Sequence, residues 1–125
     1  MLLAAGVAVG SCKDRVEPII CTEIGCESLL IVQLASMPAG AFTVEILAGS
    51  AGGANLVYQC DGIALCNQSV RFNGYDKPSA NVRVTTSKGS VTTLVNNIPY
   101  IVHAPNGDEC PPVCKQATVT VPLPA

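Results

Sequence analysis

The stretch Val82-Arg-Val-Thr-Thr-Ser-Lys-Gly-Ser-Val-Thr-Thr-Leu-Val95 decides the fold of this chain. It contains two runs rich in Val and Thr, Val82–Thr86 and Val91–Val95, on either side of a short segment that includes a glycine. β-Branched residues favour strands, and a short glycine-containing loop between two such runs is the sequence signal of a hairpin. The stretch therefore predicts two antiparallel strands joined by a turn over residues 87–90.

Runs of the same kind lie on both sides of this hairpin. Phe42, Val44 and Ile46 recur at every second position, which predicts a strand with these three side chains on the core face. Leu29–Leu34 is almost continuously apolar, as expected for a central strand that is covered on both faces. Further short strands are expected at residues 19–22, 56–60, 70–73, 100–104 and 117–121.

Turn residues separate these runs, and no segment has a convincing helical period. This spacing predicts an all-β fold, a single antiparallel β-sandwich of about seven or eight short strands with an aliphatic core. The arrangement resembles an immunoglobulin-like or fibronectin-like sandwich. The chain has no Trp, so the Cys…Trp…Cys set of antibody domains is missing. The resemblance therefore concerns the architecture and not a named family.

The N-terminus, Met1-Leu-Leu-Ala-Ala-Gly-Val-Ala-Val-Gly-Ser-Cys12, is apolar and uncharged. It is shorter than the roughly 20 residues that span a bilayer, and it ends in small residues, as the hydrophobic part of a signal peptide does. Its last four residues, Val9-Gly10-Ser11-Cys12, resemble the lipobox of exported bacterial lipoproteins. The resemblance implies cleavage before Cys12 and a lipid on its thiol. Residues 1–11 would then be a signal peptide, 12–18 a short tether and 19–125 the sandwich domain.

This segment departs from a complete signal peptide in two ways. No Lys or Arg precedes Lys13, and the segment before Cys12 is short against the usual length of about 15–30 residues. A start codon further upstream would explain both departures. An ordinary cleaved signal, or an apolar first strand of a cytosolic domain, are the alternatives to the lipoprotein interpretation.

The chain has seven cysteines, so a lipid on Cys12 would leave an even set of six. We expect three disulfides, formed in an oxidising compartment such as the periplasm or the cell surface. Six cysteines allow about 15 pairings, and the alternative to local pairs is a long-range bridge between the sheets. We favour the sequence-local set because each couple flanks a predicted turn. The expected pairs are Cys21 with Cys26, Cys60 with Cys66, and Cys110 with Cys114.

Zinc is the alternative use of these cysteines. The x3 spacing of Cys110 and Cys114 is tolerated in zinc sites, whereas the x4 and x5 spacings of the other two couples are at or beyond the usual range. We therefore expect disulfides and no cofactor. Calcium is a weaker alternative, because the acidic turns lack the Asp-x-Asp-x-Asp-Gly pattern of a calcium loop. The residues in question are Asn106 with Asp108 and Glu109, and Asp61 with Asn67. The net charge of −2 and the scattered bases give no indication of nucleic-acid binding.

His103 is the only histidine, so a hydrolase or a metal-dependent enzyme would have to use it. The chain has no Gly-x-Ser-x-Gly motif beside it. We therefore expect His103 to be structural and the protein not to be an enzyme.

We expect instead a lipid-anchored protein of the bacterial envelope, facing the periplasm or the cell surface. It would act as a binding or structural module for an unknown protein or glycan partner. Loops carry recognition in such scaffolds. The first candidate is the Pro105–Cys114 loop with Asn106, Asp108 and Glu109, and the second is the segment Asp61–Leu65. A further alternative is an adhesin or envelope subunit that assembles through an exposed Val91–Val95 edge.

Overall fold

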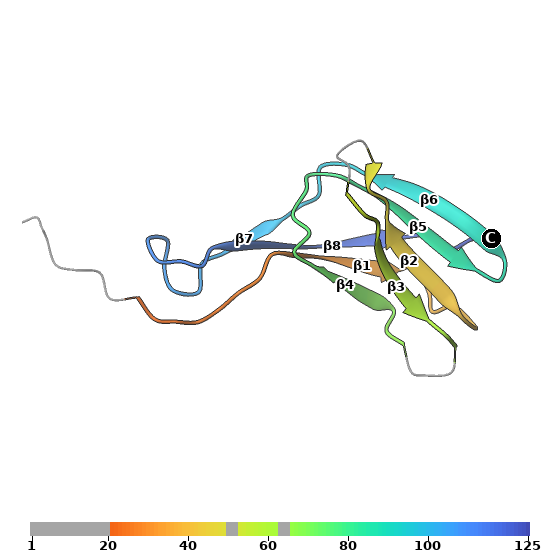
Figure 1. Ribbon diagram of the computed structural model, residues 1–125, viewed down its shortest axis with the longest axis horizontal. Coiled ribbons are helices and arrows are strands. Elements are labelled where there is room, and N and C mark those ends of the chain that lie inside the picture. The colour runs from red at the N-terminus through yellow and green to blue at the C-terminus, as the bar shows by residue number, and fades with distance from the viewer. Residues whose placement is uncertain (1–20, 50–52, 63–65) are drawn as a thin grey trace, which may run out of the picture.

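The computed structural model of the chain describes residues 21–49, 53–62 and 66–125, which form two four-stranded sheets packed face to face (Figure 1). One sheet has the order β4-β1-β8-β7, built from β1 (Leu29–Leu34), β4 (Ser69–Asn73), β7 (Ile101–His103) and β8 (Cys114–Val121). The other has the order β3-β2-β5-β6, built from β2 (Phe42–Ile46), β3 (Leu56–Cys60), β5 (Ala80–Thr86) and β6 (Gly89–Val95). The predicted all-β sandwich is confirmed.

The predicted hairpin is β5 and β6, which pair antiparallel over their whole length. Thr86 pairs with Gly89, so the turn contains two residues, Ser87 and Lys88, instead of the four that the sequence indicated. Gly89 has a φ of 123°, in a region that residues with a Cβ rarely adopt. The glycine therefore allows the strands to continue to the edge of this tight turn.

The core lies between the two sheets and is predominantly aliphatic. Its innermost side chains, all at most 2 % exposed, come from β1, β2, β4, β5 and β8: Leu30, Val32, Leu34, Val44, Val70, Val82, Val84 and Val121. The predicted core face of β2 is confirmed, because Phe42, Val44 and Ile46 are all buried. On the outer face of β1, Leu29 is buried, Ile31 is half-buried and Gln33 is exposed. This central strand is thus covered on both faces only near its start.

Two features depart from the antiparallel expectation. β1 and β8 pair in parallel, with Leu29 opposite Gln116 and Leu34 opposite Val121. In addition, β2 and β3 are neighbours in one sheet, whereas the second and third strands of an immunoglobulin domain belong to different sheets. The similarity to such domains is limited to the two-layer architecture.

The strand predicted at residues 19–22 is wrong in its described part, since Cys21 and Thr22 belong to an extended segment outside any strand. Its first two residues lie outside the described part of the chain. The strand predicted at 100–104 is shorter, at Ile101–His103, and the last strand begins earlier, at Cys114. Within residues 21–49, 53–62 and 66–125, no helix has the length and apolar character required to cross a membrane.

Candidate functional site: a disulfide-stapled arm

A slender arm projects from one end of the sandwich, at the left of Figure 1. It consists of two segments that are far apart in the sequence, residues 21–28 and residues 101–116. The second segment contains β7, the Pro105–Cys114 loop and the first residues of β8. The parallel pairing of β1 with β8 places them together, because the residues before β1 must run beside the residues before β8. We use the word arm for these two segments.

Two disulfides join the halves of the arm. Cys21 pairs with Cys110 at a Cα–Cα distance of 5.6 Å, and Cys26 pairs with Cys114 at 6.2 Å. The predicted local pairs Cys21–Cys26 and Cys110–Cys114 are therefore wrong. Two extended segments that run in the same direction bring both couples face to face as two successive bridges, whereas a local bridge would require each segment to turn back on itself.

The third predicted pair is confirmed. Cys60, at the end of β3, is bonded to Cys66 with their Cα atoms 6.0 Å apart. All six cysteines in the described part of the chain are thus oxidised, as the three-disulfide prediction required. Since a thiolate is the form that binds zinc, none of these six sulfur atoms can serve as a zinc ligand in this state.

Asn106, in the Pro105–Cys114 loop, joins the two halves of the arm through hydrogen bonds to Thr22 and Ile24. Its Oδ1 accepts hydrogen bonds from the hydroxyl of Thr22 and from the backbone N–H of Ile24 (2.9 Å). Its Nδ2 donates to the carbonyls of Ile24 (2.7 Å) and Pro111 (3.0 Å). A carboxamide has two donors and two acceptor positions, so all four are used. Asn106, which the sequence marked as a partner-binding residue, is occupied inside the arm, while Asp108 and Glu109 are exposed.

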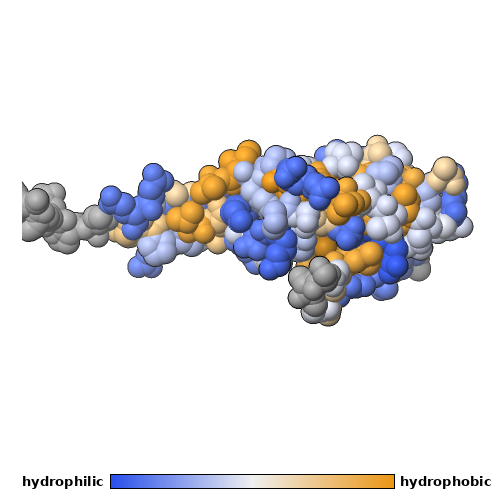
Figure 2. All heavy atoms as spheres, turned by 90° about the horizontal axis from the view of Figure 1, so that it is seen from above, coloured by the Kyte–Doolittle hydropathy of each residue, from blue (hydrophilic) through white to orange (hydrophobic). Residues whose placement is uncertain are grey.

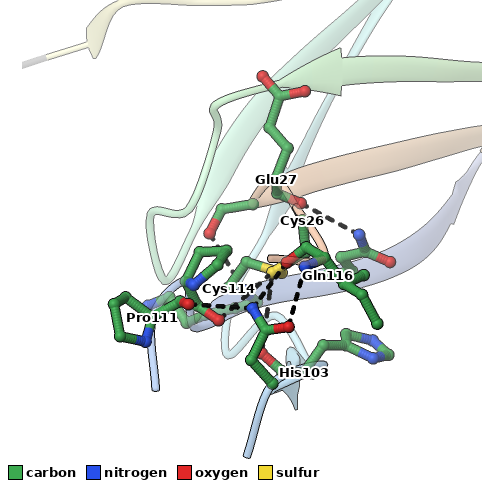
Figure 3. Close-up of a disulfide and its surroundings, with 11 residues drawn as sticks. Cys26, Glu27, His103, Pro111, Cys114 and Gln116 are labelled. Atoms are coloured by element: carbon green, nitrogen blue, oxygen red, sulfur yellow. Dashed lines mark hydrogen bonds between the residues drawn. A yellow bond between two sulfur atoms is a disulfide. The ribbon is translucent and has the colours of Figure 1, made fainter. Parts of the chain in front are cut away.

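Three further hydrogen bonds hold residues 27–28, two from the other half of the arm and one from Gly74 of the sandwich. Gln116 donates its Nε2 to the carbonyl of Glu27 at 3.0 Å, as Figure 3 shows. Ser28 accepts the backbone N–H of Lys115 on its hydroxyl at 3.0 Å, and accepts that of Gly74 on its carbonyl at 2.7 Å. These residues were not singled out in the sequence. Their polar side chains gave no signal, because the contacts depend on the parallel alignment of two distant segments.

Tyr100 connects the base of the arm to the loop after β4. Its hydroxyl donates to the carbonyl of Lys77 at 2.7 Å, and the Nζ of Lys115 lies 5.2 Å from the centre of its ring. A cation above an aromatic ring is an attractive contact. Tyr75 anchors the same loop by donating its hydroxyl to the carbonyl of Ser79. The two tyrosines therefore fix the position at which the arm leaves the sandwich.

Burial shifts the titration of both phenols at this position. It raises the pKa of Tyr100 to about 12, and the charges of Tyr75 and Asp76 act in the same direction. Burial also raises the pKa of Tyr75, again with a contribution from Asp76. Removing a phenolate from water costs free energy, and a nearby carboxylate adds repulsion. Both hydroxyls consequently stay protonated, as their donor roles require, throughout the physiological pH range.

His103 lies on the exposed edge strand β7, and Figure 3 shows its ring pointing away from the Cys26–Cys114 bridge. Beside it is an open groove of about 440 Å³ lined by Cys26, Val102, His103, Ala104, Pro105 and Gln116. This lining contains no carboxylate or hydroxyl side chain. Among the described residues, no group of three or more His, Cys, Asp or Glu side chains is placed to hold a metal.

The surface of the arm combines apolar and acidic side chains. Ile24, Ile101, Val102 and Val113 are each more than half exposed, at 54–65 %, and Figure 2 shows apolar atoms along the arm. The charged side chains of the arm are Glu23, Glu27, Asp108, Glu109 and Lys115, so the acids prevail. The arm buries no apolar layer of its own comparable to the sandwich core, and it depends on covalent bridges and hydrogen bonds for its shape.

Other predicted sites are only partly described. Cys12, the signal peptide and the tether all lie outside the described residues, as do residues 63–65 of the second candidate loop. Asp61, at the start of that loop, is exposed and borders an open cavity of about 770 Å³ at the ends of β2, β3 and β5. The rings of Phe42 and Tyr58 form part of its wall, with centroids 6.1 Å apart.

No family model, no curated protein and no solved structure matches this chain. The functional conclusions therefore depend on the sequence patterns and on the geometry of the sandwich and the arm.

Proposed function

We propose that this chain is an exported bacterial lipoprotein whose sandwich is a non-catalytic binding or structural module of the cell envelope. Three disulfides indicate a protein that matures outside the cytoplasm, since thiols are kept reduced inside it. The observation that carries the proposal is the arm. Its two bridges fasten the segment that follows the tether to the sandwich, so the proposed point of attachment is covalently fixed.

The length of the tether sets the distance from the membrane. From Cys12 to Cys21 there are nine residue steps, which span at most about 30 Å when fully extended. With a lipid on Cys12, the tip of the arm would lie close to the bilayer surface, and the arm would separate the sandwich from the membrane. Because Cys21 is bonded to Cys110, this separation does not depend on a flexible linker beyond Cys21.

The same geometry changes the expected position of partner recognition. The Pro105–Cys114 loop belongs to the arm and would face the membrane side, so Asp108 and Glu109 suit a partner that lies at the membrane surface. The opposite end of the sandwich, where the chain terminates in Figure 1, would face outward. That end includes the β5–β6 turn and a cavity of about 220 Å³ between residues 36–41, 86–88 and 123–124.

The anchor is tested by expressing the chain with its own N-terminus, and with the upstream codons if the gene has them, in a bacterium. We expect the wild-type protein to fractionate with membranes and its mature N-terminal peptide to carry the mass of a lipid on Cys12. The Cys12→Ala variant should lose both properties while it keeps the three disulfides. An unmodified Cys12, or an intact Met1 on the folded protein, would refute the anchor.

The enzymatic alternative receives no support from the site. His103 is exposed on an edge strand, and in the described part of the chain its side chain makes no hydrogen bond to a carboxylate or a hydroxyl. A general base must lie within hydrogen-bond reach of the groups that it serves. We therefore retain the binding or structural module as the proposed function.

A further inference from the structure

Strand β6 is an edge strand whose core face is incompletely covered. Its neighbour β5 places Val82 opposite Thr93 and Val84 opposite Val91. Val82 and Val84 are buried, at 0 % and 1 % exposed, so the side chains of β6 opposite them point toward the core as well. On β6, however, Val91, Thr93 and Val95 are only half-buried. The core therefore reaches β6 but is not closed there.

The opening follows from the position of β7. β6 and β7 are the last strands of the two sheets on the same side, but β7 pairs only with Cys114–Gln116 at the base of the arm. All three residues of β7 are exposed, so this strand covers nothing beneath it. On the opposite side of the sandwich, the edge strand β4 buries Val70 and Phe72, which are 2 % and 6 % exposed, while the edge strand β3 buries Cys60 but leaves Leu56 39 % exposed.

β6 also lacks the features that usually protect an edge strand. Natural edge strands carry charged residues or proline, or are very short, because their free N–H and C=O groups can pair with another chain. The sequence of β6, Gly89-Ser-Val-Thr-Thr-Leu-Val95, has seven residues and neither a charge nor a proline. Of the other edge strands, β4 carries Arg71 and β7 has only three residues, while β3 is also uncharged but is shorter than β6, with five residues. The outward-facing Leu94 of β6 is 58 % exposed.

We propose that the β6 edge pairs with the β6 edge of a second copy of this chain, antiparallel, so that the two β3-β2-β5-β6 sheets become one continuous sheet. A register centred on Thr92 pairs all seven residues and keeps the two core faces on one side. Val91 then lies beside Thr93 of the second copy, and Leu94 beside Ser90 of the second copy. The half-buried side chains of each copy cover those of the other.

The absence of charge along β6 favours a second copy as the occupant. Neither β6 strand brings a charge to the pairing, so two identical edges meet without repulsion. The nearest ionic group on the outer face of the sheet, Arg83, is already paired with Glu45 at 2.8 Å. The arm, with its excess of carboxylates, extends from the sandwich away from the β5–β6 turn (Figure 1). It therefore need not approach the arm of the second copy.

The test exploits the position of Thr92, which would face Thr92 of the second copy at the centre of the register. Like charges directly opposite each other across a strand pair are destabilising, and unlike charges are favourable. We expect the full chain with Cys12→Ser, which removes any lipid, to form a concentration-dependent dimer in analytical ultracentrifugation. Thr92→Lys and Thr92→Glu should each raise the dimer dissociation constant at least about tenfold, and an equimolar mixture of the two variants should restore the dimer.

Thr118→Lys is the matched control, because Thr118 is exposed on β8, an interior strand of the other sheet. It should leave the dimer intact. Within one copy, Thr92 lies opposite Arg83, which would repel a lysine at position 92. A glutamate at position 92 is not repelled by Arg83, so loss of the dimer in Thr92→Glu cannot be attributed to that repulsion. Far-UV circular dichroism confirms that each variant is folded. The proposal would be overturned if the chain with Cys12→Ser alone is monomeric at about 100 μM, or if the variants at position 92 still dimerise. It would also be overturned if the mixture of the two variants does not recover the dimer, or if Thr118→Lys has an equal effect.

Discussion

The sandwich and the arm are ordered by different means. In the sandwich, the side chains at the centre of each sheet are almost wholly buried, as Val44 and Val82 at 0 % exposure show. In the arm, the large aliphatic side chains are mostly in solvent, as Ile101 at 65 % shows. Burial of apolar surface stabilises the first region. Two disulfides and the side chain of Asn106 hold the second.

This difference shows what a thin structure needs. A single layer has no second face against which to bury its side chains, so it cannot gain stability from a core. Cross-links act instead by restricting the unfolded chain, and they do not require burial. The chain concentrates four of its six described disulfide cysteines in the arm, where they replace the missing core. The following experiments test how far the two regions depend on each other.

The largest effect should come from removing the arm bridges. The two cysteines of each bridge are far apart in the sequence, with a separation of 89 residues for Cys21–Cys110 and 88 residues for Cys26–Cys114. While one remains, the other closes only a small ring of roughly ten residues, worth a little under 3 kcal/mol, whereas the last bridge closes nearly the whole domain and is worth about 4.5 kcal/mol. We expect Cys21→Ser with Cys110→Ser to cost the smaller amount, and the quadruple variant that also has Cys26→Ser and Cys114→Ser to lose both. Urea denaturation measures each step.

The Cys60–Cys66 bridge is the control for this experiment, because it spans six residues within the sandwich. Its removal should cost about 2 kcal/mol, less than either arm step. If removing the second arm bridge lowers the free energy of unfolding no more than removing the first, the sandwich does not benefit from the arm, and the two regions are independent.

A smaller effect is expected for Asn106→Ala. Its four hydrogen bonds are exposed, so water replaces part of each, and we expect a loss of about 1–2 kcal/mol. Asn96→Ala is the matched control, at an exposed asparagine that follows β6, and should change stability by less than about 0.5 kcal/mol. Hydrogen exchange should show faster exchange at the amide of Ile24 in the first variant. Equal stability of both variants would show that the bridges alone order the arm.

The smallest effect concerns pH at the junction of the two regions. Folding raises the pKa of Tyr100 from 10.0 to about 12, so the folded protein holds a proton that the unfolded chain releases. The contribution of Tyr100 is complete below pH 10.0 and is lost as the pH rises toward about 12. Tyr100→Phe should make the alkaline decline in stability shallower, measured by urea midpoints between about pH 8 and pH 11. An unchanged slope would contradict this assignment.

The sandwich was more predictable from the sequence than the arm, for a physical reason. Strand positions depend on local alternation, so Phe42–Ile46 and the hairpin from Val82 to Val95 were found with small errors at the turn. Pairing in parallel requires two segments from opposite ends of the chain, and no local pattern records it. The sequence therefore predicts two separate loops, one with Cys21 and one with Cys110.

The disulfide pairing shows the same limit. Cys60–Cys66 could be predicted because the two residues are close in sequence. For the arm, a usable signal was present: Cys21 and Cys26 are five residues apart, and Cys110 and Cys114 are four apart. Nearly equal spacings fit two successive bridges between extended parallel segments. Asn106 carried no comparable signal, since an asparagine before glycine is typical of an ordinary turn.

The Cys21–Cys110 bridge also determines how tension would pass through the molecule. A pull applied between Cys21 and the C-terminus crosses the sulfur–sulfur bond to Cys110 and continues along β8 to Ala125. This covalent route bypasses every residue from 22 to 109. Force would draw β8 taut without sliding it past β1, and the remaining strands would carry no load.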